Sequence, residues 1–316
     1  MTPQAVDYPP GAIKTGEQVE CIARAGEVVA RALRCAADYA APGVTTGEID
    51  SVVRRELGEA GATALFLGYR QGDAPAFPGA ACVSVNNEVV HGIPGDRVLR
   101  AGDVVSIDVG ARVDGWCADA ATTVIVGGDT RGSVSPEELD ARRALVGTLR
   151  SALDACIESI GAGVRWLEVA GRLEDAALSA GLGMVVEYIG HGIGRELHEW
   201  PRVPAYRTGF GGDDFVLANG MVLAIEPIFT ARSDGVSTCW RGRPTNAVGV
   251  SLDGDGWTVV TKGGMVAAHE ERTVVVTGGR GAGGGPDAGF DACGVGHGLN
   301  GGYNPKPDPE REDRAI

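Results

Sequence analysis

The sequence predicts an α+β fold made of two pseudo-symmetric halves, and three observations predict it. First, the segment PGVTTGEI at 42–49 corresponds to AGVRWLEV at 162–169, at a constant offset of 120 positions. Second, each copy joins two segments whose apolar residues recur at steps of three and four, which is typical of amphipathic helices. Third, residues 104–109 alternate as a strand does, and Asp114-Gly115 then marks a hairpin turn. We therefore expect a site supplied by both halves to lie between them; the alternative is that so short a repeat is a chance resemblance.

Composition excludes several classes of protein. The 316 residues are 44% hydrophobic, which is typical of a globular protein with a buried core. No apolar run reaches the roughly 18 residues of a membrane span, and the first 20 residues lack a secretory signal pattern, so we expect a cytoplasmic protein. The net charge of −14 argues against broad binding to nucleic acid or anionic lipid, although a local basic patch such as Arg142-Arg143 stays open. The seven cysteines form no C-x-x-C pair, which indicates reduced thiols rather than disulfides or a zinc ribbon.

The first half begins with two helices. Capping boxes at 15–18 and 45–48 mark where they start, and Pro42-Gly43 and Gly61 mark where they end. Residues 1–13 are expected to form an irregular arm before them. A loop rich in glycine and proline follows at 66–79, then a strand at 81–85 and a turn-rich segment at 86–95 that contains His91.

The hairpin that follows carries two aspartates in apolar surroundings. Asp108 and Asp119 are 11 positions apart with the turn about midway, so the pattern places them on neighbouring strands. Carboxylates that face one another in a core repel and lose hydration, so each needs a cation or a proton. One interpretation is a shared metal site; the other is two surface aspartates on a half-exposed hairpin.

The second half repeats the helix pair and ends in strands. A long helix is expected at 136–160, and its partner ends at Ala180-Gly181. The apolar and β-branched runs that predict strands lie at 221–225, 245–251, 257–261 and 272–277. From Gly278 the chain is glycine-rich and then charged, so we expect a flexible tail at 278–316 after a domain at 14–277.

Five groups in strands or glycine-flanked turns are candidates for metal ligands: Asp108, Asp119, His191, Glu226 and Glu271. Glutamates at strand ends are often simply exposed, but four carboxylates and one imidazole suit a pair of divalent ions. Oxygen-rich ligands with a single nitrogen favour Mn, Fe(II) or Co, with Zn also compatible. Two such ions can share a bridging water, lower its pKa and polarise a carbonyl group.

Two more histidines, His91 and His198, stand in turns beside these carboxylates. Histidines in such places can donate to a substrate carbonyl or an oxyanion, or relay a proton. The alternative is that each is a hydrogen-bonded structural residue.

The five candidate ligands, in this order and with these flanks, resemble the methionine aminopeptidases. The resemblance covers about residues 12–277 and includes AGEVVARAL, PGVTTGEID, SVNNEVVHGIP, GDVVSIDV and GHGIGRELHEWP. It implies the pita-bread fold, with two pseudo-symmetric halves around a central antiparallel sheet. Only 35 positions separate His191 from Glu226, which resembles type I, and no zinc-binding extension precedes the first helix, which resembles the bacterial form.

The resemblance also implies a role for each candidate ligand. Asp108 would hold one metal ion, and Asp119 and Glu271 would bridge two. His191 and Glu226 would hold the other ion, and Glu226 would also take a proton from the bridging water as the general base.

By the same resemblance, His198 would stabilise the attacked carbonyl and the gem-diolate, and His91 would contact the substrate near the scissile amide. The pocket for the methionine side chain would include Tyr69, Phe77, Cys82 and Trp257. The sequence departs from the family in a longer 69–77 loop, in Leu197 and Glu270 where aromatic residues are common, and in Arg272 for a frequent histidine.

We therefore expect a metal-dependent aminopeptidase that removes initiator methionine from nascent proteins with a small second residue. It would act as a monomer on nascent N-termini, with the ribosome as a further candidate partner, and without a membrane or recognition of a nucleic-acid sequence. One alternative is a prolidase or proline-specific aminopeptidase, which usually carries a large N-terminal domain. The other is a catalytically inactive pita-bread protein that binds peptides or partners, although such proteins usually lose ligands.

Overall fold

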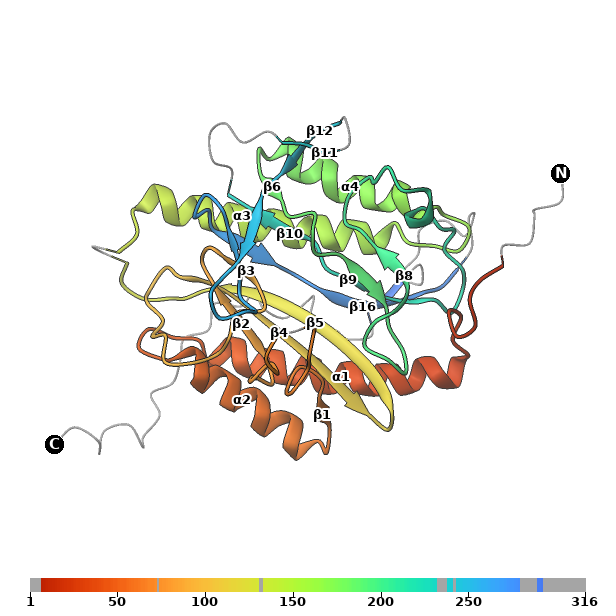
Figure 1. The fold of residues 1–316 in the computed structure, drawn as a ribbon, viewed down its shortest axis with the longest axis horizontal. Helices are drawn as coiled ribbons and strands as arrows, with labels where there is room; N and C mark the ends of the chain where they lie inside the picture. Colours follow the sequence, from red (N-terminus) through yellow and green to blue (C-terminus); the bar gives the residue numbers. More distant parts are fainter. Residues whose placement is uncertain are drawn as a thin grey trace.

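Two pairs of helices enclose the strands in the computed structural model, which describes residues 7–72, 74–130, 133–231, 238–240, 243–278 and 289–291. Helices α1 (Gly16–Tyr39) and α2 (Thr46–Glu59) lie below the strands in Figure 1, and α3 (Pro136–Glu158) and α4 (Trp166–Ser179) lie above them. Each pair packs over a buried apolar cluster of its own. The two-halved α+β architecture is therefore confirmed.

The internal repeat is visible in the bounds of the elements. Helix α4 begins and ends 120 positions after α2, and strand β6 (Gly183–Met184) follows β1 (Thr63–Ala64) at the same offset. Both predicted capping boxes are present: the hydroxyls of Thr15 and Thr45 each accept a hydrogen bond from the backbone N–H three residues on, and their own backbone N–H groups donate to the side chains of Gln18 and Glu48. At α4 the equivalent residue is Arg165, which makes no side-chain cap.

The predicted hairpin consists of β4 (Val104–Val113) and β5 (Trp116–Ile125), drawn in yellow in Figure 1. Its two-residue turn has positive φ at Asp114 (51°) and Gly115 (80°), the conformation that matches the twist of the strands. Strands β1 and β2 (Cys82–Val85) pair with β4. Val105, Ile107 and Val109 are buried in the cluster under α1 and α2, so the alternate residues, including Asp108, point to the opposite face.

The second half supplies two further sheets and completes a small one. One contains β8 (Glu199–Val203), β7 (Gly190–Gly192), β9 (Val222–Ile225), β16 (Arg272–Val276) and β17 (Gly289–Asp291). Another contains β11 (Thr238–Trp240), β12 (Arg243–Ala247), β6, β10 (Ile228–Thr230) and β15 (Ala267–His269). The small sheet contains β13 (Val250–Leu252), β14 (Val259–Thr261) and β3 (Glu88–Val90). Every described pair is antiparallel except β12 with β6.

One contact joins the two halves across the middle of the molecule. Ala121 on β5 and Glu271, just before β16, form an isolated antiparallel bridge. The backbone N–H of Glu271 donates to the carbonyl of Ala121 at 3.0 Å, and that of Ala121 donates back at 3.3 Å. This bridge brings the aspartate hairpin beside the start of β16, which the sequence pattern alone did not reveal.

One predicted strand needs correction. The predicted strand 245–251 is two, because the chain leaves β12 at Ala247 and begins β13 at Val250. The sequence analysis missed several short strands, among them β7, β8, β10 and β15, which have three to five residues each.

The two ends of the chain lie partly outside this description. Of the predicted tail 278–316, the structure describes Gly278 and strand β17, and His297 lies outside the described residues. Within the part of the chain that is described, no helix has the length and apolar character needed to cross a membrane.

Candidate metal centre and active site

A cavity of about 400 Å³ lies between the two halves, and every residue that the sequence reading proposed for the site lines it. The proposed metal ligands, catalytic histidines and pocket residues in its wall are Asp108, Asp119, His191, Glu226, Glu271, His91, His198, Tyr69, Phe77, Cys82 and Trp257. The cavity therefore gathers residues from loops and strands of both repeats, as a site between two halves requires.

The hairpin places its two aspartates diagonally across one face. Asp108 pairs with Ala121 and Asp119 pairs with Gly110, so the carboxylates occupy neighbouring positions on the same side of the sheet. Burial raises the pKa of Asp119 to about 7. Burial also raises the pKa of Asp108 well above its usual value, with the negative charges of Asp119 and Glu226 adding to the effect. The half-exposed alternative for these aspartates is wrong, because both side chains lie inside the cavity wall.

The second half brings the remaining candidate ligands to the same place. His191 lies on β7, Glu226 follows the buried end of β9, and Glu271 lies at the bridge to β5. One ligand atom from each of Asp119, His191 and Glu271 lies within 4.8 Å of the other two. His191 Nε2 is also 3.8 Å from Glu226 Oε1. Burial raises the pKa of Glu226 to about 8, with a further contribution from the charge of Asp119.

His191 is oriented as a metal-ligating histidine needs to be. Its Nδ1 lies 2.9 Å from the carbonyl oxygen of Gly192, so Nδ1 carries the proton and donates it there. The lone pair of Nε2 then points toward the carboxylates, which is the arrangement in which a backbone carbonyl fixes the tautomer of a ligand. Burial lowers the pKa of His191 to about 4, with His198 contributing, so the ring is neutral near pH 7.

The chemistry of these groups fits a divalent metal. Buried carboxylates at this separation cannot all be ionised near neutral pH unless a cation compensates them. Asp108 Oδ1 is buried without a hydrogen-bond partner among the described residues, so a metal would also satisfy an orphaned acceptor. Ligand atoms bonded to one ion at about 2.0–2.2 Å lie about 3.3–3.6 Å apart in a tetrahedral site, so the atoms of Asp119, His191 and Glu271, which lie within 4.8 Å of one another, would move modestly closer to bind one ion.

The two other predicted histidines face the same cavity. The ring of His198 lies 4.5 Å from that of His191, and its Nδ1 is 3.5 Å from the hydroxyl of Tyr69. His91 has a positive φ of 58°, which is uncommon outside glycine, and its ring packs edge-on against Tyr188 at 5.4 Å. Burial lowers the pKa of His91 to about 4 and also lowers that of His198, so both are neutral near pH 7.

The aromatic end of the cavity forms an apolar wall. Phe77 meets Trp257 edge-on at 5.4 Å, and the indole N–H of Trp257 donates to the carbonyl of Pro75 at 2.7 Å, which fixes the ring. Burial raises the pKa of Cys82 well above its usual value, so its thiol stays neutral. This end of the cavity can accept an uncharged, elongated side chain.

Sequence reasoning missed several neighbours of the site. The further lining residues are Phe66, Gln71, Glu187, Tyr188, Ile189 and Leu197. His269 is buried with Nε2 3.9 Å from Glu226 Oε2, and only the alternation of side chains before Glu271 could have indicated it.

Comparison with known proteins agrees with this site. A model of metallopeptidase family M24 matches residues 20–278. The methionine aminopeptidase of Aquifex aeolicus is 37% identical over 82% of this chain and 93% of its own. Methionine aminopeptidase 1 of Mycobacterium tuberculosis is 40% identical over 84% of this chain and 91% of its own.

Solved structures show the same likeness. The methionine aminopeptidase of Thermotoga maritima superposes with a TM-score of 0.72 at 35% identity, covering 89% of this chain and 98% of its own. The prolidase of Pyrococcus furiosus shares the fold, with a TM-score of 0.62 at 22% identity over 89% of this chain, but only 65% of the prolidase is covered. The chain belongs to metallopeptidase family M24 and, within it, to the methionine aminopeptidases.

Proposed function

We propose that this chain is a metal-dependent aminopeptidase that removes the N-terminal methionine from nascent proteins whose second residue is small. The observation that carries the proposal is the buried group of Asp119, His191 and Glu271 in the wall of a cavity with an apolar, aromatic end. The reaction is inferred from the names of the relatives, and the cavity is where we expect it to take place.

In this proposal the ligands hold two divalent ions. Asp108 would hold one ion, Asp119 and Glu271 would serve both, and His191 and Glu226 would hold the other. When bound, such ions polarise the scissile carbonyl and lower the pKa of a shared water. The donor set is compatible with Co, Mn, Fe(II) and Zn.

Glu226 is the residue we assign to move the proton. Its carboxyl lies 3.8 Å from His191 and 3.9 Å from His269, inside the cavity and away from bulk solvent. Burial raises its affinity for a proton, which suits a general base that accepts one from the attacking water and returns it to the leaving amine.

The two neutral histidines would act on the substrate. The hydroxyl of Tyr69 faces Nδ1 of His198, so a bond from that hydroxyl leaves the proton on Nε2, which can donate to the developing oxyanion. His91 would contact the substrate near the scissile amide. The methionine side chain would occupy the end formed by Tyr69, Phe77, Cys82 and Trp257, whose uncharged surface excludes charged first residues.

The proposal also covers the setting of the reaction. Residues 14–277 form the catalytic domain, with 1–13 as an arm and 278–316 as a tail, of which strand β17 pairs with β16 of the domain. The substrate is a nascent polypeptide, made in the cytoplasm, and the enzyme acts on it as a monomer, with the ribosome as a candidate docking partner.

The test is release of methionine from Met-Ala-Ser after chelation and after restoring Mn, Fe(II), Co or Zn. We expect no release after chelation, recovery with at least one metal, and loss of that recovery in Asp119→Asn. Ala-Pro and Met-Pro dipeptides distinguish the proline-specific alternative, which would cleave these and leave Met-Ala-Ser intact. A folded protein that cleaves neither with any metal would favour the peptide-binding alternative.

A further inference from the structure

Glu270, the neighbour of the proposed ligand Glu271, is a carboxylate buried completely inside the protein. Its side chain is 0% exposed, although the sequence gives it the appearance of a surface residue at a strand start. Successive side chains point to opposite faces, so Glu270 points away from the cavity that Glu271 enters. A buried carboxylate is tolerated only where charges and hydrogen bonds compensate it.

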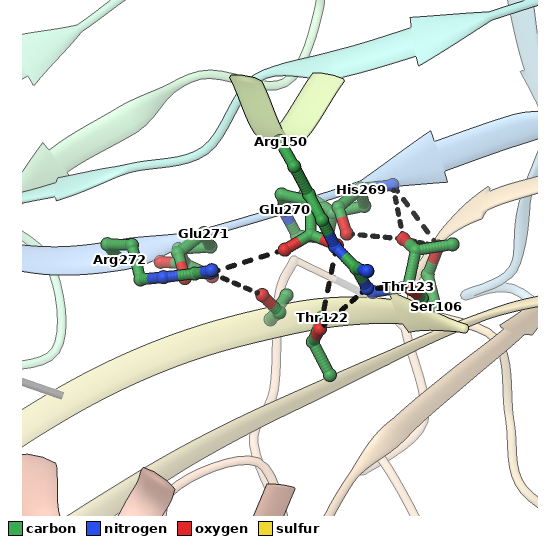
Figure 2. A network of polar contacts seen from close by, with 9 residues as sticks. Ser106, Thr122, Thr123, Arg150, His269, Glu270, Glu271 and Arg272 are labelled. Carbon is green, nitrogen blue, oxygen red and sulfur yellow. Dashed lines mark hydrogen bonds and ion pairs between the residues drawn. The ribbon is translucent and has the colours of Figure 1, made fainter. Parts of the chain in front are cut away.

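Two arginines compensate Glu270 from opposite sides, as Figure 2 shows. Arg150 descends from helix α3, and its Nε donates to Glu270 Oε1 at 2.8 Å. Arg272, itself 3% exposed, donates from Nη1 to Glu270 Oε2 at 3.3 Å. The backbone N–H of Thr123 adds a bond to Oε1 at 2.9 Å. We call Arg150, Glu270 and Arg272 the buried charge cluster.

The buried charge cluster forms hydrogen bonds to the backbone bridge between Ala121 and Glu271, which joins the two halves. Nη1 of Arg272 also donates to the carbonyls of Ala121 at 3.2 Å and Glu271 at 2.9 Å, the two carbonyls that accept the bonds of the bridge. Nη2 of Arg150 donates to the carbonyl of Thr123 on the same strand. Arg150 thus bonds to the backbone of β5, and Arg272 bonds to the backbone of Glu271.

These contacts link helix α3 to two proposed metal ligands. Glu271 is at the bridge, and Asp119 lies on β5 two residues before Ala121. The separation between these carboxylates depends on how β5 sits against the strand that carries Glu271. Thr123 reinforces the register from the other side, since its hydroxyl donates to the carbonyl of His269 at 2.6 Å and accepts from the N–H of His269 at 3.0 Å.

We propose that the buried charge cluster is a positioning device for the metal site: it fixes the register between β5 and Glu271, so that Asp119 and Glu271 can bind the same ions. The inference rests on the proposed function, because it concerns the metal site of that reaction. Buried ion pairs often add little net stability compared with apolar residues of the same volume. The directional bonds of a guanidinium do fix geometry: Arg150 forks between Glu270 Oε1 and the carbonyl of Thr123, a pattern that a lysine ammonium does not reproduce.

The test uses Arg150, which touches no proposed ligand and lies 120 positions from its carboxylate partner. Arg150→Gln removes its charge and its forked contact. The matched control is Arg142→Gln on the same helix, because Arg142 is 11% exposed where Arg150 is 28% exposed, and it donates to the carbonyl of Gly102 at 2.7 Å, away from the cluster. The measurement is the Kd of metal-free protein for Co²⁺, by calorimetry and by the visible absorption of bound Co²⁺, together with Tm.

We expect both variants to lower the Tm and only Arg150→Gln to weaken Co²⁺ binding, by about 10–100-fold, as residues that orient metal ligands typically do. At saturating metal, KM for Met-Ala-Ser should not change, since the methionine pocket is untouched. Arg150→Lys keeps the positive charge but cannot bond both Glu270 and the Thr123 carbonyl as the guanidinium does, so it should weaken Co²⁺ binding by a smaller factor. The same measurement on Arg150→Lys tests the proposal if Arg150→Gln does not fold.

The proposal is overturned if folded Arg150→Gln or Arg150→Lys binds Co²⁺ with the parent Kd and spectrum. It is equally overturned if Arg142→Gln weakens binding as much as Arg150→Gln does. A parent protein that binds no Co²⁺ and releases no methionine would instead contradict the proposed function. A parent that does both, with an unaffected Arg150 variant, would contradict the positioning role alone.

Discussion

The metal-free protein should lose stability as the pH rises through neutrality, and a bound metal should remove that loss. The perturbation is chelation, which leaves Asp108, Asp119 and Glu226 buried beside one another. Burial raises the pKa of Asp119 from 3.8 to about 7 and that of Glu226 from 4.5 to about 8. A group whose folded pKa is raised keeps its proton in the folded state after the unfolded chain has released it, so stability falls as pH rises through that window.

The histidines oppose the carboxyl slope up to about pH 7.5. Burial lowers the pKa of His91 and His191 to about 4 and of His269 to about 3, from 6.5 in each case. Their folded pKa values are depressed, so they add stability as pH rises from about 4 through 6.5, against the trend of the carboxyls. Each unfolded histidine is still half protonated at pH 6.5 and is almost entirely neutral about one pH unit higher, so from about pH 7.5 the carboxyls alone set the slope.

The magnitude follows from the linkage relation. Each carboxyl that keeps its proton lowers the free energy of unfolding by about 1.4 kcal/mol per pH unit. Glu226 alone should therefore give about 2 kcal/mol between pH 6.5 and its pKa of about 8, with Asp108 adding to this. Little further loss from Glu226 is expected above that pKa.

The assay is urea unfolding between pH 6.5 and 8.5, with EDTA and with Mn²⁺. Metal should flatten the profile, because it binds the deprotonated carboxylates of the folded state. Glu226→Gln should remove part of the slope from the chelated protein. A chelated protein whose stability is constant or rises between about pH 7.5 and 8.5, where the histidines no longer contribute, would refute the reasoning that the site is a set of uncompensated buried carboxyls.

Three further predictions concern single residues. His198→Ala should lower kcat by about 100–1,000-fold with the Kd for Co²⁺ within about twofold of the parent; steady-state kinetics with a metal titration measures both, and an unchanged kcat would remove His198 from the mechanism. Trp257→Ala should lower kcat/KM for Met-Ala-Ser by about 10–100-fold through loss of the pocket wall against Phe77; equal losses for peptides beginning with alanine would contradict a methionine pocket there. Thr15→Ala should lower the free energy of unfolding by about 1 kcal/mol and Thr15→Ser by much less, because Thr15 makes both bonds of the capping box; equal urea midpoints for the two variants would contradict this role.

Local signals in the sequence predicted much of this molecule. Capping boxes, helical periodicity and the Asp114-Gly115 turn depend on neighbouring residues, and the structure confirms each of them. The repeat predicted the two halves because helix pairs at a constant offset pack alike. Resemblance to a family then indicated site residues, and the structure places all of them around one cavity.

What the sequence did not predict depends on contacts between distant residues. Strands such as β7 and β10 have three residues each and are recognisable only by the partners they pair with. Glu270 resembled an exposed residue because the helix arginine that compensates it lies 120 positions away. The bridge between Ala121 and Glu271 likewise joins segments that no periodicity connects.

The central claim is that Asp108, Asp119, His191, Glu226 and Glu271 together bind divalent metal. Anomalous diffraction at the Mn edge, from crystals of the chelated protein soaked in Mn²⁺, tests this most directly. The account predicts anomalous peaks in the cavity within bonding distance of these side chains, with the peak beside Asp119 absent in Asp119→Asn. Peaks only at other side chains, or none in crystals of protein that releases methionine, would contradict it.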